Sequence, residues 1–167
     1  CVKLMCLLVQ SNFLGFLEDS LWAAEIRNSL WLYPFLEIVH ITGIVMLVGA
    51  ALFFDIRLLG YARFMKVSAA ATYLLPLSRK GLWLILPSGV LLFITNAKSL
   101  GVDPVFWLKM ALLLIAAINV GIFHQVILKS AAGNDIDLKV PVSAKCSALI
   151  SVIAWLSIIA CGRLLAY

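Results

Sequence analysis

Long apolar stretches, separated by short polar segments, dominate the hydrophobic pattern of the chain. The four longest stretches have 17 to 25 residues each. A helix rises by about 1.5 Å per residue, so each stretch is long enough to cross a hydrocarbon core of roughly 30 Å. The pattern therefore predicts four transmembrane helices, at residues 31–54, 81–97, 104–128 and 146–166.

A more polar segment precedes the first predicted span. In residues 12–30, NFLGFLEDSLWAAEIRNSL, apolar side chains recur at roughly helical spacing beside acidic and basic ones. This pattern predicts an amphipathic helix that lies in the membrane interface. Asp19 or Ser20 is expected to be its N-cap, because a short side-chain oxygen can accept a hydrogen bond from the first turn.

The composition supports a membrane protein and excludes an ordinary soluble domain. Of the 167 residues, 64% are hydrophobic and 13% are charged, and the mean hydropathy is +1.10. Soluble domains carry about 25% charged residues. We therefore predict one all-α domain over residues 1–167, a polytopic membrane four-helix bundle with an N-terminal amphipathic interfacial helix, surrounded by the lipid bilayer.

The formal charge of +5 indicates topology rather than a nucleic-acid partner, because the basic residues lie in short connections between apolar stretches. One side of the predicted bundle carries eight of them: Arg57, Arg63, Lys66, Arg79, Lys80, Lys129, Lys139 and Lys145. The other side carries five: Lys3, Arg27, Lys98, Lys109 and Arg163. Cytoplasmic loops are enriched in Lys and Arg, so loops 57–80 and 129–145 are expected in the cytoplasm and both termini in the periplasm.

Small residues recur in the last two predicted spans. Ser147, Ser151, Ala154 and Cys161 lie at helical spacing, and Ala117 and Gly121 lie four residues apart. Small side chains let helix backbones approach closely in lipid. The interpretation we favour is packing inside the bundle, and the alternative is a contact between copies of a homo-oligomer.

Six polar residues within or beside the predicted spans form a candidate intramembrane polar cluster: Glu37, His40, Asp55, Arg57, Lys109 and Asn119. Ionisable side chains are costly inside a membrane, so each is a candidate site unless it is paired. At 100° per residue, Glu37 and Asp55 project from the same face of their helix, with His40 about 60° away. On the third span, Lys109 and His124 also fall within about 60° of each other. The first and third spans are therefore each expected to carry one polar stripe.

The depth of these residues predicts an ion pair. Measured from the middle of each span, Glu37 lies ~9 Å and Lys109 ~12 Å towards the outer side. We therefore expect a salt bridge or a shared water between them, with His40 beside it. The same group could relay protons, which keeps a small transporter as a third functional alternative.

Two histidines within membrane helices, His40 and His124, are candidate ligands of a b-type haem. Their depths differ by roughly 15 Å, so they are not expected to share one iron. If haem is bound, we expect His40 to be the ligand, with Glu37 one turn away as an orienting group. The alternative is that both histidines are hydrogen-bonded within the bundle.

The sequence contains no GxGxxG, Walker lysine loop, HExxH or nucleophile elbow, so no catalytic motif indicates an enzyme. The four cysteines, Cys1, Cys6, Cys146 and Cys161, lack CxxC or metal-ligand spacing and are expected to pack as small apolar residues. Cys1 leaves open a processed or lipidated terminus.

Two segments carry a resemblance to a known family. Residues 32–60, LYPFLEIVHITGIVMLVGAALFFDIRLLG, and residues 104–124, PVFWLKMALLLIAAINVGIFH, resemble a family of small bacterial inner-membrane proteins of unknown function. The shared motifs are Trp31-x-Tyr33-Pro34, Glu37-x-x-His40, Asp55-x-Arg57 and Phe106-x-x-Lys109. The resemblance implies a four-helix fold and no established activity. A looser similarity to copper-resistance and cytochrome b561-like membrane bundles keeps haem under consideration.

These observations favour a non-catalytic accessory or anchoring subunit of a larger inner-membrane assembly, with other membrane subunits or further copies of the chain as partners. The alternative is a membrane electron carrier that binds haem b.

Overall fold

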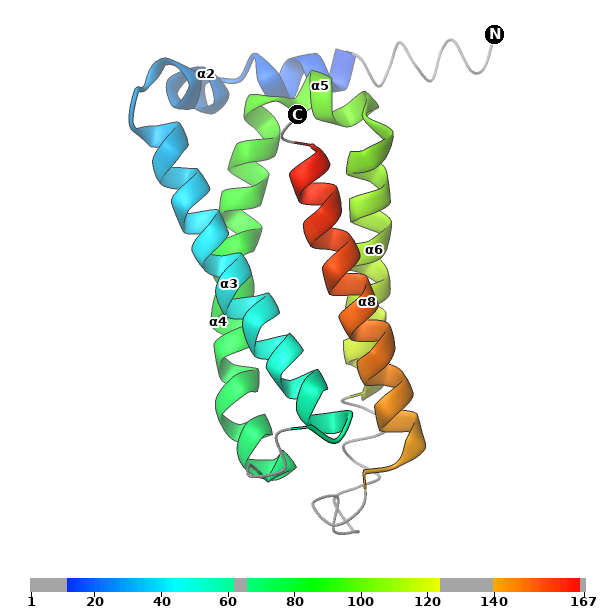
Figure 1. Ribbon diagram of the computed structural model, residues 1–167. Helices are drawn as coiled ribbons and strands as arrows, with labels where there is room; N and C mark the ends of the chain where they lie inside the picture. Colours follow the sequence, from blue (N-terminus) through cyan, green and yellow to red (C-terminus); the bar gives the residue numbers. More distant parts are fainter. Residues whose placement is uncertain (1–11, 62–65, 124–139, 166–167) are drawn as a thin grey trace, which may run out of the picture.

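The computed structural model describes residues 12–61, 66–123 and 140–165. Within these ranges the regular secondary structure is helical, without strands, which confirms the all-α prediction. Four of the helices are long and apolar enough to cross a membrane: α3 (Leu32–Leu58), α4 (Val67–Thr95), α6 (Pro104–Ile122) and α8 (Val142–Leu164) (Figure 1). The chain is therefore a multi-pass membrane protein.

Helix α4 differs most from the sequence prediction. It begins at Val67, well before the predicted start at Gly81, and it contains Pro76 as well as Pro87. Pro76 therefore does not end the helix, although proline is disfavoured in a helix interior. A proline costs a helix one hydrogen bond, but Val67 and Ala70 are both fully buried and hold the first turns of α4 against the neighbouring helices.

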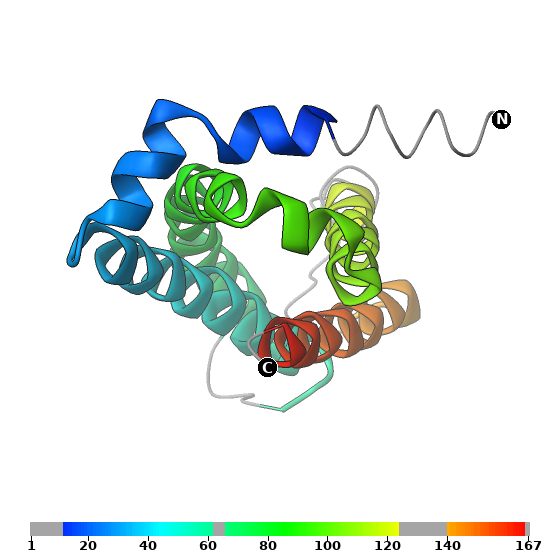
Figure 2. The ribbon, with the colours of Figure 1, turned by 90° about the horizontal axis from the view of Figure 1, so that it is seen from above.

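The four long helices follow one another around the bundle in the order α4, α3, α8 and α6. Helix α3 packs against α4 and α8, and α6 packs against α8 (Figure 2). Among the described residues, α4 and α6 make no close backbone contact along their length. They are joined at one end by α5 (Ala97–Val102), where the rings of Phe93 and Phe106 stack with centroids 5.2 Å apart. We call this end of the bundle the α5 end, and the opposite one the far end.

Two glycines set the distance between α3 and α4. A Cβ atom added to Gly81 would lie 2.7 Å from the Gly43 carbonyl oxygen and 2.7 Å from the Leu47 amide nitrogen. A Cβ atom added to Gly43 would lie 3.0 Å from the Gly81 carbonyl oxygen. The two backbones are therefore in direct contact, which is how helices without a hydrophobic driving force pack in lipid.

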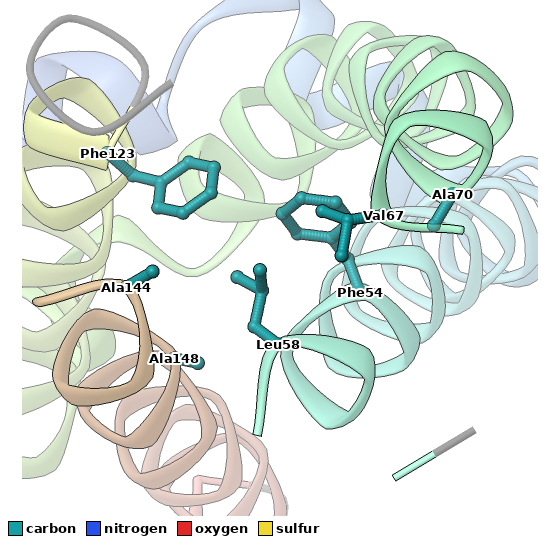
Figure 3. Close-up of a cluster of buried hydrophobic side chains, with 7 residues drawn as sticks. All are labelled: Phe54, Leu58, Val67, Ala70, Phe123, Ala144 and Ala148. Atoms are coloured by element: carbon teal, nitrogen blue, oxygen red, sulfur yellow. The ribbon is translucent and has the colours of Figure 1, made fainter. Parts of the chain in front are cut away.

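The best-buried apolar cluster lies at the far end, between α3, α4 and α8 and the end of α6. Phe54 meets Phe123 edge to face, with ring centroids 5.5 Å apart. Around them lie small or branched side chains: Leu58, Val67, Ala70, Ala144 and Ala148 (Figure 3). A second cluster follows nearer the α5 end: Val48, Ala116, Ala154, Trp155 and Ile158.

The small residues of α8 lie inside the bundle. Ser147, Ser151, Ala154 and Cys161 are all buried, which confirms the interpretation that they serve helix packing. Gly121 on α6 differs, because a Cβ atom added there meets nothing within 4 Å. Gly121 therefore does not serve close packing as the small residues of α8 do.

The N-terminal segment crosses the α5 end of the bundle (Figure 2). The prediction of one helix over residues 12–30 is wrong in one respect, because residues 12–18 and α2 (Leu21–Asn28) are separate helices. The break falls at Asp19 and Ser20, and the Ser20 side chain caps α2 by accepting a hydrogen bond from the Ala23 amide. The predicted capping residue is thus confirmed, although the helix that it caps is shorter.

Hydrogen bonds fix this segment to the junction of α4 and α5. The Glu18 carboxylate accepts from the Lys98 amide at 2.7 Å. Arg27 donates to the carbonyl oxygens of Thr95, at 3.0 Å, and Glu18, at 2.7 Å. Large apolar side chains on the same segment remain exposed: Phe13, Phe16, Leu21, Trp22 and Leu30. A segment that is tied to the bundle and exposes aromatic side chains is typical of the membrane interface.

Candidate functional site

His40 lies in the first half of α3 and directs its ring at α4. Its Nδ1 atom lies 2.9 Å from the Ser88 hydroxyl oxygen. The Ser88 hydroxyl donates its single proton to the Leu84 carbonyl oxygen at 2.5 Å, so it accepts from His40. The neutral imidazole therefore carries its proton on Nδ1 and a lone pair on Nε2.

Gly89 makes this approach sterically feasible. A Cβ atom added to Gly89 would lie 3.0 Å from His40 Cε1 and 3.6 Å from Nδ1. The ring of His40 also hydrogen-bonds the backbone of Ile85. Ser88, Gly89 and the Ile85 backbone thus form a cradle on α4 that fixes the orientation and the tautomer of the imidazole.

Lys109, in the second turn of α6, extends its ammonium group towards the last turn of α8. A Cβ atom added to Gly162 would lie 3.9 Å from Lys109 Nζ. The carbonyl end of a helix carries a partial negative charge, which favours a cation there. Lys109 is also near enough to His40 and to the buried Cys161 for electrostatic interaction. His40 and Lys109 thus belong to one polar region at the α5 end.

Glu37 does not join this region. Its side chain is exposed, and the described residues contain no ion pair between Glu37 and Lys109. The predicted salt bridge is therefore wrong. The two residues match in depth, but among the described residues α3 and α6 make no close backbone contact. Helix α8 packs against both of them and separates them. The proton relay proposed for Glu37, His40 and Lys109 has no hydrogen-bonded path within the described chain.

The remaining members of the predicted polar cluster lie further from the α5 end. Asp55 and Arg57 are buried near the end of α3, and the Ser151 hydroxyl of α8 hydrogen-bonds the Asp55 carboxylate. Asn119 joins α6 to α8 by two bonds: it donates to the Ser147 carbonyl oxygen at 3.0 Å and accepts from the Ser147 hydroxyl at 2.9 Å. The six residues thus occupy several places rather than one.

Sequence reasoning missed Ser88 and Gly89. The sequence marks these two residues only by a Pro-Ser-Gly run inside an apolar stretch. They face His40 because of the register between α3 and α4, which the sequence of one helix does not give. The second haem candidate, His124, lies outside the described residues. Within the described part of the chain, no three His, Cys, Asp or Glu side chains are grouped as metal ligands would be.

Comparison with known sequences places the chain in a family. A family model described as "Family of unknown function (DUF6644)" matches residues 11–167. The chain belongs to this family. No curated protein and no solved structure matches it. Membership of this family is consistent with the uncharacterised family expected from the sequence. The comparisons give the chain a family but no activity.

Proposed function

We propose that the protein is a non-catalytic accessory or anchoring subunit of a larger assembly in a bacterial inner membrane. The observation that carries this proposal is the exposure of Glu37. By its spacing, Glu37 projects from α3 in the same direction as Asp55 and within about 20° of Val48. Val48 and Asp55 are both buried, yet Glu37 is exposed.

The difference follows from the arrangement of the helices. Figure 1 shows α3 and α8 closer together at the far end than at the α5 end. The face of α3 that α8 covers further along is therefore uncovered around Glu37. A carboxylate on an uncovered helix face at this depth is costly in lipid unless a partner supplies a cation or donors. A transmembrane helix with a basic residue, contributed by another subunit, has the matching chemistry.

Glu37→Gln tests this proposal by removing the charge at nearly constant shape. The tagged protein, extracted in mild detergent, should retain a partner protein that the Glu37→Gln variant loses, while the thermal unfolding temperature of the isolated chain stays unchanged. Thr42→Val is the matched control, because Thr42 is exposed on the same helix and its hydroxyl bonds Ile38 of its own helix. Equal partner recovery in both variants would contradict the role of Glu37.

The orientation is part of the proposal, and the distribution of basic residues supports it. We expect the α5 end to face the periplasm and the far end the cytoplasm. In a cysteine-free background, a cysteine placed at Ser99, beside α5, should react with a membrane-impermeant maleimide added to intact cells. A cysteine placed at Ser68, near the start of α4, should stay unlabelled. The reverse labelling pattern would overturn the orientation.

A second candidate function, a haem b electron carrier, is favoured by the cradle around His40. Ligand histidines donate their second ring N–H to a fixed acceptor, which sets the tautomer and leaves Nε2 for the metal. His40 meets this condition through Ser88. Lys109, at the α5 end, could neutralise a haem propionate. Haem would supply one-electron chemistry, while His40 would hold it and Ser88 would fix the orientation of the His40 ring.

A further inference from the structure

Two buried polar atoms lack hydrogen-bond partners within the described residues. One is Asp55 Oδ2 on α3 and the other is Trp155 Nε1 on α8. Each residue exposes only 6% of its surface. Buried polar groups are nearly always satisfied, so a pair of orphaned atoms indicates a missing partner.

The two atoms belong to the same part of the α3–α8 interface. Ser151 hydrogen-bonds the Asp55 carboxylate, and Trp155 follows Ser151 by four residues on the same face of α8. Side chains on a helix lean towards its N-terminus, so the Trp155 indole leans over the turn that holds Ser151. The buried cluster that contains Trp155 is also packed against Ala51 and Leu52, which lie within one turn of Asp55 on α3.

We propose that a single water molecule is bound between Asp55 and Trp155 and bridges α3 to α8. The water accepts a hydrogen bond from Trp155 Nε1 and donates one to Asp55 Oδ2. This water site is independent of the uncovered face of α3 around Glu37 and of the proposed function.

The chemistry of the two atoms selects water over other small ligands. A metal cation would suit the carboxylate oxygen but would be repelled by the indole N–H, whose hydrogen is positive. An anion would suit the indole but would be repelled by the carboxylate. A molecule that both accepts and donates satisfies both atoms, and buried waters commonly fill this role.

Nuclear magnetic resonance of the 15N-indole groups, in nanodiscs, tests the proposal. The signal assigned to Trp155 by its loss in Trp155→Phe should show a cross-peak to a long-lived bound water, and Asp55→Leu should abolish that cross-peak. The exposed Trp22 and Trp83 serve as internal controls and should show only exchange with bulk solvent. A Trp155 indole without a bound-water cross-peak in the unaltered protein would overturn the proposal.

A second measurement does not depend on any variant folding. A high-resolution map of the unaltered protein should show an isolated peak within hydrogen-bond distance of both Asp55 Oδ2 and Trp155 Nε1. A direct Asp55–Trp155 hydrogen bond would exclude the bridging water. Thermal stability that rises with sodium or potassium at constant ionic strength, and loses that dependence in Asp55→Asn, would show that a cation occupies the site instead.

Discussion

Gly81→Ala should destabilise the protein, whereas Gly49→Ala should leave its stability unchanged or slightly higher. The Cβ atom at Gly81 would fall 2.7 Å from two backbone atoms of α3, and backbone cannot move aside as a flexible side chain can. The helices must separate, and overpacking of this kind costs roughly 1–3 kcal/mol. At Gly49 the same atom meets nothing within 4 Å, and alanine favours the helix over glycine by up to about 1 kcal/mol.

Thermal unfolding in one detergent measures this difference. Gly121→Ala is a second control, because an added Cβ atom there also meets open space. Gly43→Ala should behave like Gly81→Ala, and the double variant should lose less than the sum, because the backbones already stand apart after the first change. Equal unfolding temperatures for Gly81→Ala and Gly49→Ala would contradict the close contact of α3 and α4.

If the protein binds haem, His40→Ala should abolish the Soret band of the protein reconstituted with haemin. The lone pair on His40 Nε2 is available because the ring proton lies on Nδ1, which donates a hydrogen bond to the Ser88 hydroxyl oxygen. Ser88→Ala should weaken haem binding by about 10- to 100-fold, since the imidazole loses its fixed orientation. Absorbance titration with haemin measures both effects.

Two controls accompany the haem titration. Thr42→Val changes a hydroxyl on the same helix that bonds only its own backbone at Ile38, so it should leave the titration unaltered. His124→Ala should likewise leave the Soret band. Loss of the band in His124→Ala, with retention in His40→Ala, would assign the iron to the other histidine.

Hydropathy predicted the four spans because apolar runs of this length have few alternatives to crossing a membrane. It did not predict where α4 begins. Residues 67–80 include Pro76, Arg79 and Lys80, and their hydropathy is too low to predict part of a transmembrane helix. Helix structure there depends on contacts with other helices, such as the burial of Val67 and Ala70, which the hydropathy of one segment does not report.

Residue type and depth predicted part of the candidate site. His40 stands out because an ionisable side chain inside a span is rare, but its partner Ser88 depends on the register set by the contact between Gly43 and Gly81. The similar depth of Glu37 and Lys109 in the membrane also led to the wrong prediction of a salt bridge between them. Depth does not give the order of helices around the bundle, and α8 packs against both α3 and α6.

The most direct test of the accessory role places a photoreactive benzophenone amino acid at position 37 in living cells. Illumination should join the chain to a different membrane protein, because the uncovered face around Glu37 is where we expect the partner helix. The same group at Val45, which is exposed elsewhere on α3, should give little of that product. Adducts at position 37 with lipid alone, or with a second copy of this chain alone, would contradict the proposal.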